Sequence, residues 1–130
     1  MAAQTYLTGA REVGLAKSST YLYYFTHVMP GPESAEHGAF HTSDVPYFLN
    51  VFSAERANYW AQVDYNMGNT MSAYLLNVAK TGNPGGTGLP AWNPTHKGYN
   101  YLELRENSKM VTMNTEQIAF WNAYLTDKFA

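Results

Sequence analysis

The sequence predicts a mixed α/β fold, and three features of the chain carry this prediction. An uninterrupted apolar and aromatic run at residues 20–26 indicates a strand, and apolar residues recur with helical spacing from about Ala54 to Val78. Two further strand-like segments, 99–104 and 109–113, flank a turn. The 130 residues fit one domain of ordinary size with a real core.

Composition and charge exclude several classes of protein. The net charge is −2 and the sequence has no run of Lys or Arg, so we expect neither a nucleic-acid partner nor binding to an anionic membrane. No apolar segment is long enough to span a bilayer. Because cysteine is absent, disulfide frameworks, thiolate zinc sites and cysteine nucleophiles are excluded.

The first half of the chain is predicted to hold one strand in a loop-rich setting. Residues 6–17 indicate at best a short amphipathic helix. The run 20–26 is apolar on both faces, which is typical of a central strand in a helix-flanked parallel sheet. Since no second run of this kind exists, we expect the sheet to be incomplete. Residues 28–39 are predicted to be a loop because Pro and Gly interrupt them.

Two helices are predicted next. Thr42 or Ser43 is expected to cap a short helix over residues 44–49, with a proline in its first turn. Ser53 is the expected N-cap of the long helix, and Gly82 its C-terminal stop. The apolar face of the long helix comprises Trp60, Val63, Met67, Met71, Tyr74 and Val78, widened by Tyr59, Leu75 and Ala79.

The last third of the chain is predicted to be a loop, a strand pair and a helix. The loop 85–98 is expected to be held in place by Leu89 and Trp92. Residues 105–108 favour a turn between the two strands, which would close a hairpin. Asn114 or Thr115 is the expected cap of a final helix. Its apolar face comprises Ile118, Trp121, Leu125 and Phe129.

Chemistry is most concentrated in the stretch 36–47, which holds His37, His41 and Asp44. Histidine titrates near neutral pH, so a histidine held by a loop is a candidate for proton transfer. The spacing of His37 and His41 also suits zinc on one helix face, with Asp44 completing the site. Gly38 and the preceding prolines disfavour a helix there, so no metal or other cofactor is predicted. His27 and His96 are interpreted as surface or cap residues.

A nucleophile is harder to find. The sequence has no Gly-x-Ser-x-Gly elbow, and the partial imitation around Ser34 has Pro32 and Glu36 where small residues are needed. We therefore interpret Ser34 as a surface serine. The glycine-rich stretch 82–88 follows a helix and lacks the Lys-Ser/Thr of a phosphate loop, so it is interpreted as an ordinary loop.

Five segments, in this order and spacing, resemble the carboxy-terminal portion of type B carboxylesterases, which include the cholinesterases. They are Tyr21–Phe25, Gly38–Tyr47, Asn77–Pro84, Leu89–Trp92 and Phe120–Leu125. The resemblance covers nearly the whole chain. It implies the C-terminal part of an α/β-hydrolase fold, and residues 1–130 would then form a single partial domain.

The resemblance also implies roles for individual residues. His41 matches the histidine of a Ser-His-acid triad, which acts as general base toward the serine and then as general acid toward the leaving alcohol. Asp44 matches a structural carboxylate near the triad, usually Glu, and not the triad acid. Thr42 stands where the family commonly has Gly. His37 has no role in the pattern.

The implied activity is carboxylic-ester hydrolysis, yet the nucleophile elbow, the oxyanion hole and the triad acid lie upstream in this family. We therefore expect the chain alone to be inactive, with the amino-terminal part of the hydrolase domain as its missing partner. The alternative is a non-catalytic module that self-associates through the strand Tyr21–Phe25. A third, weaker interpretation is a small hydrolase with Ser34 or Ser43 as nucleophile. The ester and the cellular compartment stay open.

Overall fold

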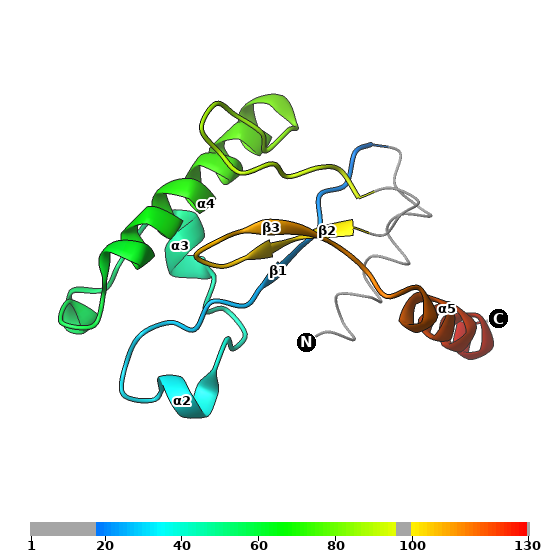
Figure 1. The fold of residues 1–130 in the computed structure, drawn as a ribbon, viewed down its shortest axis with the longest axis horizontal. Helices are drawn as coiled ribbons and strands as arrows, with labels where there is room; N and C mark the ends of the chain where they lie inside the picture. The colour runs from blue at the N-terminus through cyan, green and yellow to red at the C-terminus, as the bar shows by residue number, and fades with distance from the viewer. Residues whose placement is uncertain (1–17, 96–99, 130) are drawn as a thin grey trace. The chain divides into compact units, whose positions relative to one another are not determined.

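The computed structural model describes residues 18–95 and 100–129, and Figure 1 shows its secondary structure. The elements in chain order are β1 (Tyr23–Phe25), α2 (Ser34–His37), α3 (Val45–Leu49), a 3₁₀ turn (Ala54–Arg56), α4 (Gln62–Thr81), β2 (Asn100–Leu104), β3 (Lys109–Thr112) and α5 (Thr115–Phe129). The predicted helix at 6–17 and His96 lie outside the described residues. The mixed α/β class is confirmed.

The chain divides into two compact units. One holds the chain up to Tyr24, residues 91–103 and the part from Lys109 onward, while the other holds Phe25–Pro90 and Leu104–Ser108. Each unit is described by itself below. The assignment of residues 1–130 to a single partial domain stays a prediction.

The three strands form a sheet in the order β1-β2-β3. β2 and β3 pair antiparallel, with Asn100 opposite Thr112 and Glu103 opposite Lys109, which confirms the predicted hairpin. The amide of Leu102 donates to the carbonyl of Leu22. Within the described sheet β2 therefore lies in the middle, not the strand predicted at Tyr21–Phe25, because β2 bonds to a neighbour on each edge.

Trp92 anchors the loop that precedes β2, as the sequence predicts. Its indole nitrogen donates to the carbonyl of Leu22 at 3.1 Å, and its ring meets Tyr21 and Tyr23 edge to face. The neighbouring Thr95 is 4% exposed and donates its hydroxyl to the carbonyl of Asn100 at 2.7 Å. The loop between α4 and β2 is therefore bound to the backbone at Leu22, just before β1, and at Asn100, the first residue of β2.

Helix α5 begins where the sequence predicts. The side-chain oxygen of Asn114 accepts hydrogen bonds from the amides of Glu116 and Gln117, at 2.9 and 3.2 Å, which is the geometry of an N-cap. Ile118 is buried. The side chains of Leu125 and Phe129 lie outside the described part of the chain.

Helix α4 ends as predicted but begins later. Gly82 has the left-handed conformation of a C-cap (φ 75°, ψ 4°). The start near Ala54 is wrong, since Ser53 caps only the 3₁₀ turn by accepting from the amide of Glu55 at 3.3 Å. The reason is Trp60, which turns inward to donate its indole N–H to the carbonyl of Ser53 and is followed by extended backbone.

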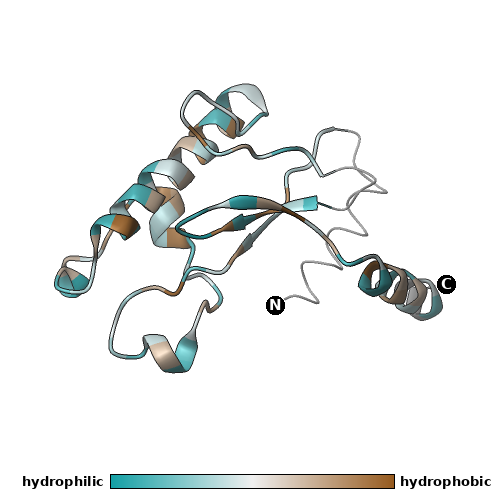
Figure 2. Cartoon of the chain, viewed as in Figure 1, coloured by the Kyte–Doolittle hydropathy of each residue, from teal (hydrophilic) through white to brown (hydrophobic). Residues whose placement is uncertain are grey.

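The inner face of α4 is broadly the predicted one. Met67, Met71 and Tyr74 are buried, and hydrophobic and hydrophilic residues alternate along the helix in Figure 2, as in an amphipathic helix. Val78, Tyr59 and Leu75 are exposed, contrary to prediction. The buried face instead includes Asp64 and Gly68. Helix α3 packs against this face.

In the described ranges 18–95 and 100–129, no helix has the length and apolar character needed to cross a membrane.

Candidate active site

His41 sits in a tight turn between α2 and α3. The amide of Ser43 donates to the carbonyl of Phe40 at 3.1 Å, which closes a four-residue turn with His41 and Thr42 at its centre. Thr42 has a φ of 72°, the positive value that a type II turn requires at its third residue. The side chain of His41 is exposed. The turn thus presents an imidazole to the surroundings on a hydrogen-bonded backbone.

A buried serine braces this turn. Ser43 is 1% exposed and its hydroxyl donates to the carbonyl of Phe40 at 2.7 Å, beside the bond from its own amide. The predicted cap of α3 is therefore wrong, because the hydroxyl of Ser43 is used inside the turn. The N-cap position of α3 belongs to Asp44, whose side chain makes no capping bond, and Pro46 occupies the first turn as expected.

The metal interpretation of this stretch depends on His37 and His41 sharing a helix, which they do not. Helix α2 is a single helical turn within the stretch 28–39 that was predicted to be a loop. It ends at His37, and Gly38 follows with a φ of 57°. The ring of His37 meets Phe40 edge to face at 6.0 Å. In the described residues no three His, Cys, Asp or Glu side chains are grouped so that they could hold a metal ion.

A pocket of about 430 Å³ lies beside α2 and is lined by Met29, Glu33, Ser34, His37, Gly38, Phe40 and Arg56. Arg56 donates to the carbonyl of Pro30 at 3.2 Å and lies 3.6 Å from the Glu33 carboxylate. The pocket therefore has a mixed lining, with an ion pair beside a methionine and an aromatic ring.

Neither candidate serine is arranged as a nucleophile. The hydroxyl of Ser34 donates to the carbonyls of Met29 and Gly31, at 2.8 and 2.6 Å. The hydroxyl of Ser43 donates to a carbonyl as described above. A nucleophilic serine instead donates to a histidine that takes its proton. The geometry thus gives no support to the interpretation as a small self-sufficient hydrolase.

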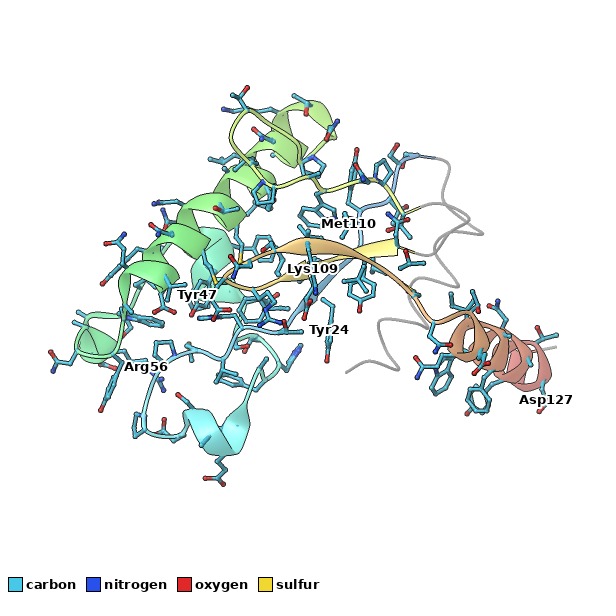
Figure 3. All side chains as sticks on the ribbon, viewed as in Figure 1. Tyr24, Tyr47, Arg56, Lys109, Met110 and Asp127 are labelled. Atoms are coloured by element: carbon cyan, nitrogen blue, oxygen red, sulfur yellow. The ribbon has the colours of Figure 1, made fainter. Side chains whose placement is uncertain are left out.

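The residues that sequence reasoning missed are Tyr47, Asp64, His27 and Glu106, called the buried cluster below, in which all but the exposed side chain of Glu106 are buried. One ring nitrogen of His27 lies 2.9 Å from an oxygen of Asp64, and the other lies 2.9 Å from an oxygen of Glu106. The hydroxyl of Tyr47 donates to the same Asp64 oxygen at 2.7 Å. Figure 3 shows Tyr47 where α3 faces α4. His27 is 6% exposed, so its interpretation as a surface residue is wrong.

The buried cluster shifts two ionisation equilibria. Burial, reinforced by the neighbouring Asp64, raises the pKa of Tyr47 far above its ordinary value, so the phenol stays neutral and donates. Partial burial alone would raise the pKa of Glu106, but its own backbone N–H, His27 and Arg105 outweigh that effect and lower it. Glu106 is therefore a carboxylate that accepts.

A signal for this cluster was present in the sequence. Asp64 stands four residues after Trp60 and three before Met67, which places a carboxylate on the apolar face of the helix. A buried carboxylate needs partners, and the amide of Ala61 supplies one by donating to Asp64 at 2.9 Å. Only the fold shows that His27 and Glu106 supply the others.

Comparison with known proteins agrees with the resemblance. The model of the carboxylesterase family matches residues 3–121. Bile salt-activated lipase of Bos taurus is 34% identical over 127 residues, which cover 90% of this chain and 21% of that protein. Carboxylesterase 4A of Bos taurus is 32% identical over 105 residues, covering 78% of this chain and 18% of that protein. The chain spans about a fifth of the length of these relatives. The chain belongs to the carboxylesterase family.

Proposed function

We propose that this chain is the histidine-bearing segment of a carboxylic-ester hydrolase of the Ser-His-acid type, with His41 as its general base. The observation that carries the proposal is the exposed imidazole of His41 on a closed, braced turn. Family membership supports ester hydrolysis as the reaction. Two relatives are named for esters or lipids, the carboxylesterase and the lipase, which fits carboxylic esters as the substrate class.

In this proposal His41 takes the proton of a serine hydroxyl as that oxygen attacks the ester carbonyl. It then gives the proton to the leaving alcohol, and a water molecule repeats the sequence to release the acid. Asp44 is a structural carboxylate at the start of α3 and not the triad acid.

The serine, the triad acid and the oxyanion donors come from polypeptide outside these 130 residues. The engagement of Ser34 and Ser43 with backbone carbonyls supports this part of the proposal. Because the triad and the oxyanion hole act as a unit, the 130-residue chain alone is expected to be inactive.

The test begins with the DNA upstream of the Met1 codon. An in-frame continuation that encodes a Gly-x-Ser-x-Gly elbow gives the longer chain, in which His41→Ala should lower kcat for p-nitrophenyl butyrate by more than about 10³-fold. His37→Ala is the matched control, since it removes another exposed histidine of the same stretch, and should leave kcat unchanged. Turnover by the 130-residue chain alone that survives His41→Ala would contradict the proposal.

The site of assembly in this proposal is β1. The run that contains this strand is apolar and aromatic on both faces, which is typical of a strand covered on both sides, and within the described sheet β1 stands at the end of the strand order. We propose that the remainder of the hydrolase supplies a further strand beside β1, and that a second copy of the chain does so when the remainder is absent. Light scattering of the isolated chain should then show a dimer or larger species, and a monomer at all concentrations would contradict self-association.

A further inference from the structure

We infer that the buried cluster positions His41, and that the hydroxyl of Tyr47 is the group through which it does so. The inference rests on the proposed function, because it assigns Tyr47, Asp64 and His27 as positioning residues for the proton transfer at His41. None of them is a catalytic residue.

The first step is the pair of contacts at His27. Each ring nitrogen lies 2.9 Å from a carboxylate oxygen, one of Asp64 and one of Glu106. The ring of His27 is therefore held from both sides, by a carboxylate at each nitrogen. Asp64 has three partners, the ring of His27, the hydroxyl of Tyr47 and the amide of Ala61.

The second step is what the cluster joins. His27 follows β1, Tyr47 lies in α3, Asp64 lies in the first turn of α4, and Glu106 lies in the turn between β2 and β3. All four residues belong to one compact unit. Asp64 is 1% exposed and Tyr47 is fully buried, so the bonds that Asp64 accepts from Tyr47 and makes with His27 are shielded from water.

The third step connects Tyr47 to His41. The amide of Tyr47 donates to the carbonyl of Asp44, and the amide of Val45 donates to the carbonyl of Thr42, both at 3.1 Å. These bonds link the first turn of α3 continuously to the turn around His41. A shift of Tyr47 within the core is therefore passed to the backbone that carries the imidazole.

The fourth step is the size of the effect. A base in a Ser-His-acid site must lie within hydrogen-bond reach of the serine, and a misplacement of about 1 Å can cost as much as 10²-fold in rate. A loosened α3 should therefore lower kcat while leaving KM nearly unchanged, since the substrate is bound by other groups.

The experiment compares Tyr47→Phe with Tyr74→Phe. Both residues are fully buried, and each donates its hydroxyl at 2.7 Å, Tyr47 to Asp64 and Tyr74 to the carbonyl of Pro90. Both variants keep the ring and remove the hydroxyl, whose bond is buried in the case of Tyr47 and part-buried in the case of Tyr74. Urea denaturation measures the stability that each variant loses, so exchange can be compared after correction for that loss, and the remaining difference reports what the bond of Tyr47 holds in place.

Hydrogen exchange of the amides of Ser43 and Val45 is measured on the 130-residue chain. Tyr47→Phe should speed their exchange about tenfold relative to Tyr74→Phe. In the ester-hydrolysing longer chain, Tyr47→Phe should lower kcat about tenfold with KM within about twofold, and Tyr74→Phe should change neither.

Equal exchange in the two variants would overturn the inference, as would equal kcat values in an active enzyme. If the longer chain proves inactive with native His41, the proposed function fails and the positioning role fails with it. In that case faster exchange in Tyr47→Phe would still show that the cluster holds the turn. The two failures are thus told apart by the exchange measurement.

Discussion

Thr42 occupies a backbone conformation that its side chain disfavours. Its φ of 72° lies in the left-handed region, which costs an L-residue roughly 1–2 kcal/mol and is hardest for β-branched residues. The same position commonly holds glycine in the proteins that the sequence resembles, and glycine adopts this conformation freely. The strain is held by the two bonds from Ser43 to Phe40.

We therefore expect Thr42→Gly to raise the free energy of unfolding by about 0.5–1 kcal/mol, measured by urea denaturation. The gain is smaller than the strain because glycine also adds freedom to the unfolded chain. Ala73→Gly in the middle of α4 is the control and should lower the free energy of unfolding by about 1 kcal/mol. A loss in Thr42→Gly as large as in the control would mean that the turn is unstrained.

For single residues, the sequence predicted the helix ends, which depend on neighbouring residues, and missed burial that depends on residues far along the chain. The stop at Gly82 and the cap at Asn114 are local signals and are confirmed. Burial of His27 was missed because its two carboxylate partners lie 37 and 79 residues away. The role of His41 stays a prediction that rests on the resemblance.

Helix α4 lies close against the preceding chain at Gly68. A Cβ added there would lie 2.6 Å from the side-chain oxygen of Asn50 and 2.7 Å from the ring of Phe52. Asn50 can swing away, but Phe52 is packed against Tyr47 and Trp60, with ring centroids 5.6 and 5.0 Å apart. The glycine is therefore needed for contact and not for its backbone conformation.

Gly68→Ala should lower the free energy of unfolding by about 1–3 kcal/mol, because the overlap with Phe52 exceeds the gain in helix propensity. Urea denaturation of the single variant and of a Phe52→Ala background measures the difference. Removal of the ring should make Gly68→Ala neutral or stabilising. An equal loss in both backgrounds would show that Phe52 is not the obstacle.

The cap of α5 gives a prediction in the other unit. Asn114→Ala removes the acceptor for two amides at the start of the helix and should cost about 1 kcal/mol of stability. Asn122→Ala, an exposed position inside the same helix, is the control and should change stability by less than about 0.5 kcal/mol. Circular dichroism during thermal unfolding measures both, and similar losses would contradict a capping role.

Elements whose signals are local were predictable, and those shaped by packing were not. The hairpin β2–β3 follows from a turn between two strand-like runs. The late start of α4 does not, because helical spacing continues through Trp60 while the indole turns toward Ser53. Likewise Ser43 was predicted as a cap, but its hydroxyl bonds to Phe40.

For the molecule as a whole, the buried tyrosines predict an alkaline limit of stability. Burial raises the pKa of Tyr74 from 10.0 to about 12, and that of Tyr47 further still. In the unfolded chain the pKa of tyrosine is about 10. Above this pH the unfolded state loses protons that the folded state keeps. Stability should accordingly be constant on the neutral side of that pKa and fall as the pH rises beyond it.

Ultraviolet titration of tyrosinate should show Tyr47 and Tyr74 ionising only as the chain unfolds. The variant Tyr47→Phe removes one such group, so its stability should fall less steeply with pH above about 10. Ordinary titration of both phenols in the folded chain would contradict their burial.

The fold class and the family follow from the sequence alone, because periodicity and motif order are read along the chain. Division into two units was not predicted, since it depends on which segments from the two halves of the chain come together.

Several partners in this fold are far apart in the sequence, so they are synthesised at different times. His27 leaves the ribosome 79 residues before Glu106, and Leu22 leaves 70 residues before Trp92. During that interval β1 has neither its strand neighbour nor its indole anchor, and an imidazole destined for the interior still lacks one carboxylate. Nascent chains should thus stay dependent on chaperones until the hairpin emerges, and premature stop codons within β2 should yield material that proteases remove.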